Sequence, residues 1–256
     1  MNFGIDISGW DSPIDWVKYK TKGRFMFAKA FEYQQDRMFS DHWTNSKGNV
    51  DRGAYYFWRQ SPDVEDKART EKFLDVIGRE NYDGELPVVI DLEDNKANRA
   101  TVFKQMDRLS ERIKQVTGRY PIIYTGLSYW KEIGGLKATP FWCSVHPMWI
   151  SLPNLDYDPN FELKYQEILA GRQMPFIPNV PPYTKVDFIQ WTYRGKPSDV
   201  PGYAQNGKKA VDFNLYLGSD TEYALLTKNQ VITIPELTDK EKLDILWKEH
   251  NLSITR

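Results

Sequence analysis

Short apolar runs alternate with longer segments of helical periodicity along most of the chain. Continuous apolar runs are typical of strands buried on both faces, and their alternation with helices indicates a βα fold with a mostly parallel sheet. Eight segments are predicted as strands: 3–8, 24–31, 51–58, 86–93, 120–125, 147–151, 187–192 and 211–216.

Two of the intervening segments have strong helical periodicity. Segment 63–77 places Phe73, Leu74 and Ile77 on one face, and segment 99–117 repeats the pattern before Gly118. Eight strands with crossover helices predict an α/β barrel of the TIM kind. The proline-rich segment 150–186 is weakly helical, so we expect the last third of the barrel to be irregular.

The pattern changes after Gly218. Segment 231–234 reads as a short strand, and Thr238 to Glu241 forms a capping box that opens a short amphipathic helix. We therefore divide the chain into a barrel over residues 1–218 and a C-terminal tail over residues 219–256. The tail is expected to pack on the barrel, with docking to an unknown partner as the alternative.

Composition narrows the class of protein. The 256 residues include 34 Lys and Arg against 35 Asp and Glu, so no general attraction to nucleic acid is expected. The single Cys143 excludes an intrachain disulfide. The start of the chain lacks the basic and apolar regions of a signal peptide, and no apolar stretch suits membrane insertion. These features predict synthesis in the cytoplasm.

Acidic residues follow the predicted strands. Asp91 and Glu93 end the apolar run 86–93, and because side chains alternate along a strand they face the same way, with Cα atoms roughly 6.6 Å apart. Asp6 lies on the first strand and Asp212 on the last, which are neighbours if the barrel closes. Two like charges in a partly desolvated cleft push their pKa values apart. One carboxyl can then stay protonated near neutral pH while the other remains anionic, as acid catalysis requires. Asp6 or Asp212 alone is at least as well explained as a helix cap or an ion-pair partner, whereas two adjacent like charges at the end of an apolar strand favour a functional role for Asp91 and Glu93.

The order and spacing of short motifs resemble glycoside hydrolase family 25, the N-acetylmuramidase lysozymes common among bacteriophage endolysins. The similarity spans about residues 3–218. Its pieces begin with Gly4-Ile5-Asp6-Ile7-Ser8, Trp10, Ile14-Asp15-Trp16, Phe27-Ala28-Lys29-Ala30-Phe31-Glu32 and Arg52-Gly53-Ala54-Tyr55-Tyr56. They continue with Pro87 to Glu93, Pro121-Ile122-Ile123-Tyr124-Thr125, Met148-Trp149-Ile150, Gln190-Trp191 and Val211-Asp212-Phe213-Asn214.

The resemblance implies a flattened barrel with eight strands but fewer than eight helices. It implies a peptidoglycan hydrolase that cleaves the β-1,4 bond from N-acetylmuramic acid to N-acetylglucosamine, without a metal or organic cofactor. Glu93 would be the general acid, with Asp91 beside it and Asp6 and Asp212 lining the cleft. The enzyme would reach the cell wall after release or delivery.

Aromatic residues near the strand ends are candidates for sugar binding. The candidate substrate-binding residues are Tyr124, Trp149, Gln190, Trp191, Tyr55 and Trp10. Lys29 and Glu32 are expected to form an interior ion pair rather than catalytic groups. Tyr56, where family members often carry His, and Ile189 and Trp191 around Gln190 depart from the family pattern.

Two stereochemical outcomes are open. The 2-acetamido group of muramic acid favours substrate assistance, in which its carbonyl oxygen attacks C1, Asp91 stabilises the intermediate and Glu93 later activates water with retention of configuration. The alternative is inversion, with Asp6 or Asp212 activating water directly.

Other classes of protein fit less well. The four acids are hard oxygen ligands suited to Mg²⁺ or Ca²⁺, whereas the three histidines have no zinc-motif spacing. A chitinase-like barrel would carry further acids where this chain has Val89 and Leu86. A glycan-binding or virion-associated protein without turnover is the main alternative.

Overall fold

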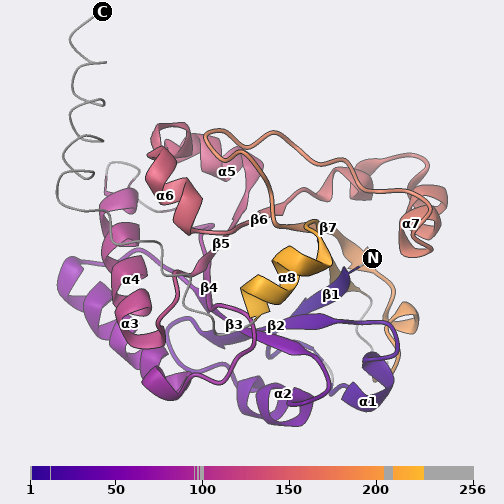
Figure 1. Cartoon of the computed structure of the whole chain (residues 1–256), viewed down its shortest axis with the longest axis horizontal. Helices are drawn as coiled ribbons and strands as arrows, with labels where there is room; N and C mark the ends of the chain where they lie inside the picture. Colours follow the sequence, from indigo (N-terminus) through magenta and orange to yellow (C-terminus); the bar gives the residue numbers. More distant parts are fainter. Residues whose placement is uncertain are drawn as a thin grey trace, which may run out of the picture.

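Eight strands form one closed barrel in chain order (Figure 1). The computed structural model describes residues 2–11, 13–94, 96, 98, 101–204 and 210–227. The strands are β1 (Asn2–Ile7), β2 (Phe25–Phe31), β3 (Asp51–Phe57), β4 (Val89–Asp91), β5 (Ile122–Gly126), β6 (Met148–Ser151), β7 (Phe188–Gly195) and β8 (Val211–Tyr216). All eight predicted strands are confirmed.

Strand direction departs from a regular βα barrel at one place. Strands β1 to β7 run parallel to one another, as expected for a mostly parallel sheet. Strand β8 is antiparallel to both β7 and β1. The start of β8 therefore lies at the same end of the barrel as the carboxyl ends of the other strands.

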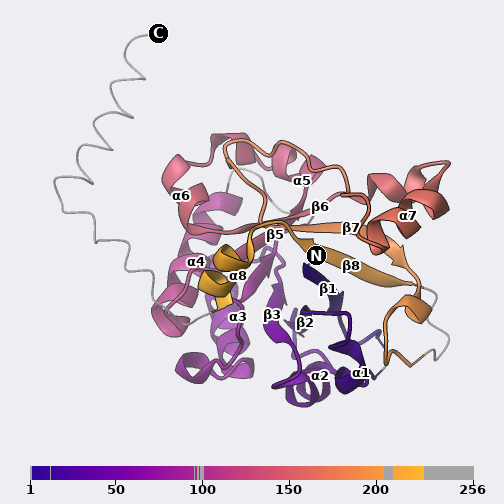
Figure 2. The same ribbon diagram turned by 45° about the vertical axis from the view of Figure 1, so that its right-hand side comes forward.

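The helices surround the barrel unevenly. They are α1 (Trp16–Tyr19), α2 (Phe39–Ser46), α3 (Asp63–Val76), α4 (Val102–Thr117), α5 (Leu127–Glu132), α6 (Pro140–Val145), α7 (Phe161–Leu169) and α8 (Asp220–Thr227). The described part thus holds eight α-helices where fewer than eight were expected. Helices α5 and α6 share one connection, and the described residues between β7 and β8 contain a short 3₁₀ turn but no α-helix. Figure 2 shows α3 and α4 on one side of the barrel and α7 on the other.

The two strongest helical patterns correspond to α3 and α4. Helix α4 buries Met106, Leu109 and Ile113 against the barrel. It ends at Gly118, whose φ of 80° is the left-handed conformation that glycine adopts without strain. Segment 170–186, inside the stretch expected to be irregular, contains no helix or strand.

Large aromatic side chains fill the barrel interior. Phe27 stacks on Trp149 with ring centroids 4.4 Å apart, and Phe188 packs edge-on against Phe27. Gly53 makes room for this filling, because a Cβ there would lie 2.4 Å from the Phe27 ring. A second, larger cluster joins the outer faces of the strands to the helices. Alternating side chains thus build one core inside the barrel and one around it.

Helix α8 covers the end of the barrel where the parallel strands begin. Tyr223 on α8 packs against Tyr216 and Phe25 of the interior, and Asp220 pairs with Arg24 just before β2. Figure 1 shows α8 lying across the barrel beside the N-terminus. This end is closed by packing, so an open site is expected at the opposite end.

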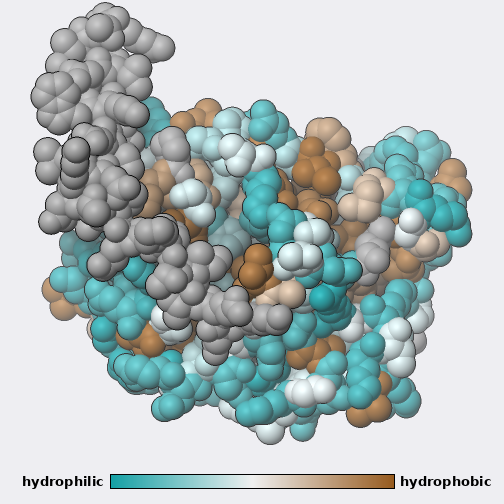
Figure 3. Space-filling model, viewed as in Figure 1, coloured by the Kyte–Doolittle hydropathy of each residue, from teal (hydrophilic) through white to brown (hydrophobic). Residues whose placement is uncertain are grey.

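Hydrophobic residues are scattered over the face that carries α8 rather than gathered in one patch (Figure 3). None of the helices in the described part is long and apolar enough to cross a bilayer. The predicted strand at 231–234 and the helix after Thr238 lie outside the described residues.

Candidate active site

The four predicted acids line one cavity of about 210 Å³ at the carboxyl ends of the parallel strands. Asp91 ends β4, and Glu93 follows two residues later. Asp6 near the end of β1 pairs with Asp212 near the start of β8. The reversed direction of β8 brings Asp212 to this end, since the start of a parallel strand would lie at the other end of the barrel.

Aromatic and amide side chains form the walls of this cavity. Among the predicted binding residues, Tyr55, Tyr124, Trp149 and Gln190 all line it. Each of them is at least nine-tenths buried, so the walls are held in place by packing. Rigid walls of this kind are suited to a ligand that fits between aromatic faces.

A hydrogen-bond network fixes Asp6. Its Oδ2 accepts from Gln190 Nε2 at 3.0 Å and from Asn214 Nδ2 at 2.6 Å. Asn214 Oδ1 in turn accepts from Trp149 Nε1 at 2.9 Å, and Gln190 Oε1 accepts from the Tyr124 hydroxyl at 2.9 Å. The amide donors are therefore oriented by the walls and directed at the Asp6 carboxylate.

Burial and like charge act together on Asp91 and Glu93. Burial, followed by repulsion from Glu93 and Asp6, raises the pKa of Asp91 well above its usual range. Burial and then Asp6 also raise the pKa of the half-buried Glu93. Asp91 Oδ1 is buried without a hydrogen-bond partner. The pair therefore retains a proton at a higher pH than two separate carboxyls would.

Two cations moderate this effect. Lys29 and Arg59 lower the pKa values of both acids through their positive charge. Each cation lies over the ring of Phe57, Lys29 Nζ at 4.7 Å and the Arg59 guanidinium at 4.3 Å from its centroid. Glu32 bonds both of them, and its ion pair with Lys29 at 2.6 Å confirms the interior pair predicted from the sequence.

Two predicted binding residues lie outside the acidic cavity. Trp191 is 1% exposed and packs with Tyr165 and Phe213 in the outer core, because it points to the face opposite Gln190. The structure therefore does not support sugar contact by Trp191. Trp10 is 82% exposed and lines a neighbouring pocket.

Sequence reasoning missed several residues of the site. Asn214 lies two residues after Asp212, and Ser151 lies two residues after Trp149. Residues two apart on a strand face the same side, so the sequence already indicated that Asn214 and Ser151 face the cavity. Ser151 Oγ donates to Gln190 Oε1 at 2.8 Å. Tyr193 reaches the cavity because the register of β7 against β8 shifts after Gln190, and no local pattern signals that shift.

A family model described as glycosyl hydrolases family 25 matches residues 5–199, which include Asp6, Asp91 and Glu93. The chain belongs to this family. The match stops before β8, so Asp212 and Asn214 are placed by the structure and not by the family model.

Relatives and solved structures agree with this membership. Lysozyme M1 of Streptomyces globisporus is 31% identical over 54% of this chain and 53% of its own length. The chain spans about half the length of the first relatives it matches by sequence. A family 25 glycosyl hydrolase from Bacillus anthracis shares the fold with a TM-score of 0.66 at 26% identity, covering 89% of this chain and 94% of that one. The CTP1L endolysin has a TM-score of 0.61 at 20% identity, with 88% and 70% covered.

The departures from the family pattern lie away from the acids. Tyr56 is fully buried in the outer core, where its ring stacks on Phe73 with centroids 5.1 Å apart. Ile189 is also fully buried in that core. Within the described residues, no group of His, Cys, Asp or Glu side chains has the arrangement of a metal site.

Proposed function

We propose that this family 25 protein is a lysozyme of the N-acetylmuramidase type. It would hydrolyse the β-1,4 bond between N-acetylmuramic acid and N-acetylglucosamine in peptidoglycan. The observation that carries the proposal is the close pair of Asp91 and the half-buried Glu93 in an aromatic-walled cavity that also holds Asp6 and Asp212. Glycoside cleavage requires one carboxyl that holds a proton and one that carries negative charge, and a coupled pair that shares one proton supplies both.

The residues of the cavity fit distinct roles. Glu93, which is less buried than Asp91, would protonate the leaving oxygen. Asp91 at the end of β4 would stabilise the positive charge that develops during cleavage. Asp6 and Asp212 would complete the negative field of the cleft. Tyr55, Tyr124, Trp149 and Gln190 would contact the sugar rings, with Trp10 adding a contact further out.

We infer retention by substrate assistance. The 2-acetamido carbonyl oxygen attacks C1 while Glu93 donates its proton to the leaving oxygen, which gives a bicyclic cation beside Asp91. Glu93, now deprotonated, takes a proton from the water whose oxygen attacks C1. The bond between C1 and the acetamido oxygen breaks, so the acetamido group is restored and C1 regains its original configuration. Proton NMR of the first-formed anomer tests this step, because an initially inverted product requires Asp6 or Asp212 to activate water directly.

Product analysis tests the proposed activity itself. Purified peptidoglycan is digested, the new reducing ends are reduced with borohydride, and the terminal sugar is identified. Muramitol is expected from a muramidase, whereas glucosaminitol would show cleavage of the other glycosidic bond. Binding to cell walls without new reducing ends would instead indicate a glycan-binding protein.

We further propose an endolysin role, in which the enzyme reaches the wall from inside the host cell. The fold shared with the CTP1L endolysin supports this role. Expression of the chain in a bacterial cytoplasm is expected to lyse the cells only when a pore-forming protein is expressed with it. Lysis that needs no pore former would argue for another route.

A further inference from the structure

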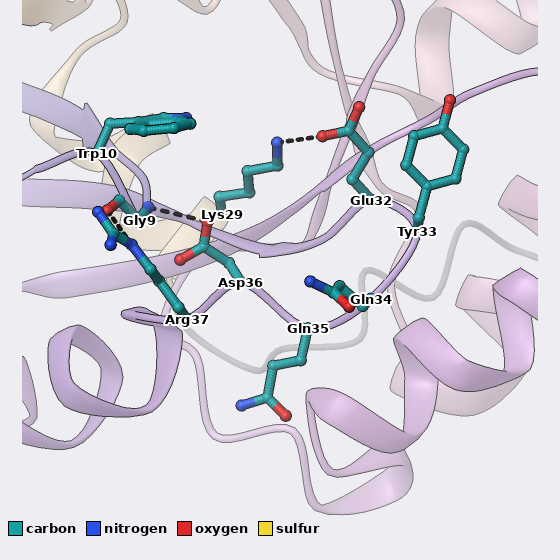
Figure 4. A pocket seen from close by; sticks show the side chains of 9 residues that line it. All are labelled: Gly9, Trp10, Lys29, Glu32, Tyr33, Gln34, Gln35, Asp36 and Arg37. Carbon is teal, nitrogen blue, oxygen red and sulfur yellow. Dashed lines mark hydrogen bonds and ion pairs between the residues drawn. The ribbon is translucent and has the colours of Figure 1, made fainter.

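A second cavity, of about 360 Å³, adjoins the acidic one. Figure 4 shows its lining side chains, which come from β2 itself and from the segments that follow β1 and β2 on the chain. We call it the outer pocket and define it by Gly9, Trp10, Lys29 and residues 32–37. It is larger than the acidic cavity, and of its lining residues only Trp10 has a role in the function proposed above.

Two exposed aromatic rings stand on opposite sides of the outer pocket (Figure 4). Trp10 is 82% exposed and Tyr33 is 59% exposed. The Arg37 guanidinium lies 5.5 Å from the Trp10 ring, and the Arg69 guanidinium lies 4.7 Å from the Tyr33 ring. Each ring is thus held by a cation while part of its surface stays open to a ligand.

The charged groups between these rings are already bonded within the pocket. Lys29 Nζ donates to Glu32 at 2.6 Å, and Asp36 accepts from the Gly9 N–H at 2.9 Å. Arg37 Nε donates to the Gly9 carbonyl at 2.6 Å. A charged ligand would have to compete with these bonds, whereas a neutral ring with apolar faces and hydroxyl edges would not. The chemistry of the pocket therefore favours a pyranose ring over an ion.

The outer pocket and the acidic cavity share a wall. Lys29 lines the outer pocket, and its ammonium lies over the ring of Phe57, which lines the acidic cavity. Strand β2 is separated from β4 by β3, so their ends are two strand spacings, ~10 Å, apart. This is about the length of two linked pyranose rings.

We propose that the outer pocket binds a sugar of the same glycan strand at least two positions from the bond that is cleaved. The inference rests on the proposed muramidase function and extends it to substrate length. The enzyme would therefore prefer glycan strands long enough to reach from the acids to Trp10 and Tyr33.

The test measures kcat/KM for peptidoglycan glycan oligomers of increasing length. The wild-type protein is expected to show a step in kcat/KM at the length that reaches the outer pocket. Trp10→Ala and Tyr33→Ala are each expected to lower kcat/KM about tenfold for the oligomers that reach the outer pocket, mainly by raising KM. The shorter oligomers should be cleaved as by the wild-type protein. Phe176→Ala, which removes a 71% exposed ring elsewhere, is the matched control and should keep the step.

Two further results separate the possible failures. If both variants reduce kcat/KM equally at every length, or if the step persists in them, the outer pocket is not a subsite. If the wild-type protein cleaves none of the oligomers, the proposed activity fails, and calorimetric titration of the Glu93→Gln protein still tests the pocket. In that background Trp10→Ala must weaken binding of the long oligomer more than that of the short one.

Discussion

At the scale of single residues, the site depends on which carboxyl holds a proton and which accepts hydrogen bonds. Asp6 is fixed as an acceptor by Gln190 and Asn214. Burial raises the pKa values of Asp91 and Glu93, so these two are the proton-holding pair. This division of roles among carboxyls follows from their surroundings, since the side chains are chemically alike.

Glu93→Gln is expected to lower kcat by about 10²–10⁴-fold, because an amide cannot donate the proton that the leaving oxygen needs. Binding to peptidoglycan should be retained, since the walls of the cavity are untouched. Turnover of purified cell walls and a pull-down with them check the two expectations. Glu167→Gln, which changes a glutamate paired with Arg172, is the control. Near-normal turnover by Glu93→Gln would show that another group is the general acid.

Arg59→Gln is expected to shift the alkaline limb of the pH profile of kcat/KM to higher pH. Arg59 lowers the pKa of Glu93, so its removal raises that pKa and keeps the acid protonated over a wider range. The shift should be about half a pH unit, as expected for a partly screened charge. Arg172→Gln, which removes a surface guanidinium, should leave the profile in place. A shift to lower pH would contradict the proposed role of Glu93.

At the scale of elements, a buried polar contact joins the end of helix α6 to helix α4. His146 at the end of α6 donates from Nδ1 to the Trp142 carbonyl at 2.8 Å. Its Nε2 therefore accepts from the Ser110 hydroxyl on α4. The neutral imidazole, with its proton on Nδ1, satisfies both partners, and burial disfavours a second proton on the ring.

Burial lowers the pKa of His146 to about 4. In the unfolded chain His titrates near pH ~6.5, so below that pH the unfolded state binds a proton that the folded state does not. The contribution of His146 to stability is complete above pH ~6.5 and is lost as the pH falls toward about 4. The loss should reach about 3 kcal/mol.

Urea unfolding of the wild-type protein and of His146→Gln between pH 7 and 4 measures this effect. Since Gln does not titrate, the wild-type protein should lose more stability over this range than the variant. If the free energy of unfolding falls equally with pH in the two proteins, His146 has the same pKa in the folded and the unfolded state, which contradicts the prediction.

At the scale of the whole molecule, the barrel separates stability from chemistry. Helix α8 and Tyr223 close one end, where Arg24 lies 3.9 Å from the Tyr223 ring. The acids and the outer pocket occupy the other end. This arrangement is general in βα barrels, in which the carboxyl ends of the strands carry the site.

Tyr223→Ala is expected to destabilise the protein by about 3 kcal/mol, because it leaves a cavity under Tyr216 and Phe25. At a temperature where the variant is still folded, kcat/KM for peptidoglycan should match that of the wild-type protein. Thermal unfolding and initial rates on cell walls check the two expectations. Leu225→Ala, at a 45% exposed position on the same helix, is the control for stability. A large loss of kcat/KM in folded Tyr223→Ala would show that the two ends are coupled.

Local patterns in the sequence were sufficient for the eight strands, for two of the helices and for the candidate acids. Short apolar runs marked the strands because most of their residues are buried, and the spacing of Asp91 and Glu93 put them on one face. Periodicity also located α3 and α4. Side chains alternate along a strand, so Gln190 and Trp191 must face opposite ways and cannot both line the cavity. Gln190 lines it, and Trp191 faces the outer core.

Only the tertiary structure decided how these pieces meet. The direction of β8, which brings Asp212 beside Asp6, depends on pairing with β1 and β7 rather than on the residues of β8 alone. The register shift that carries Tyr193 into the site and the wall shared by the two cavities depend in the same way on contacts between distant segments. A sequence determines local periodicity and chemistry, whereas direction, register and burial are set by pairing across the closed barrel.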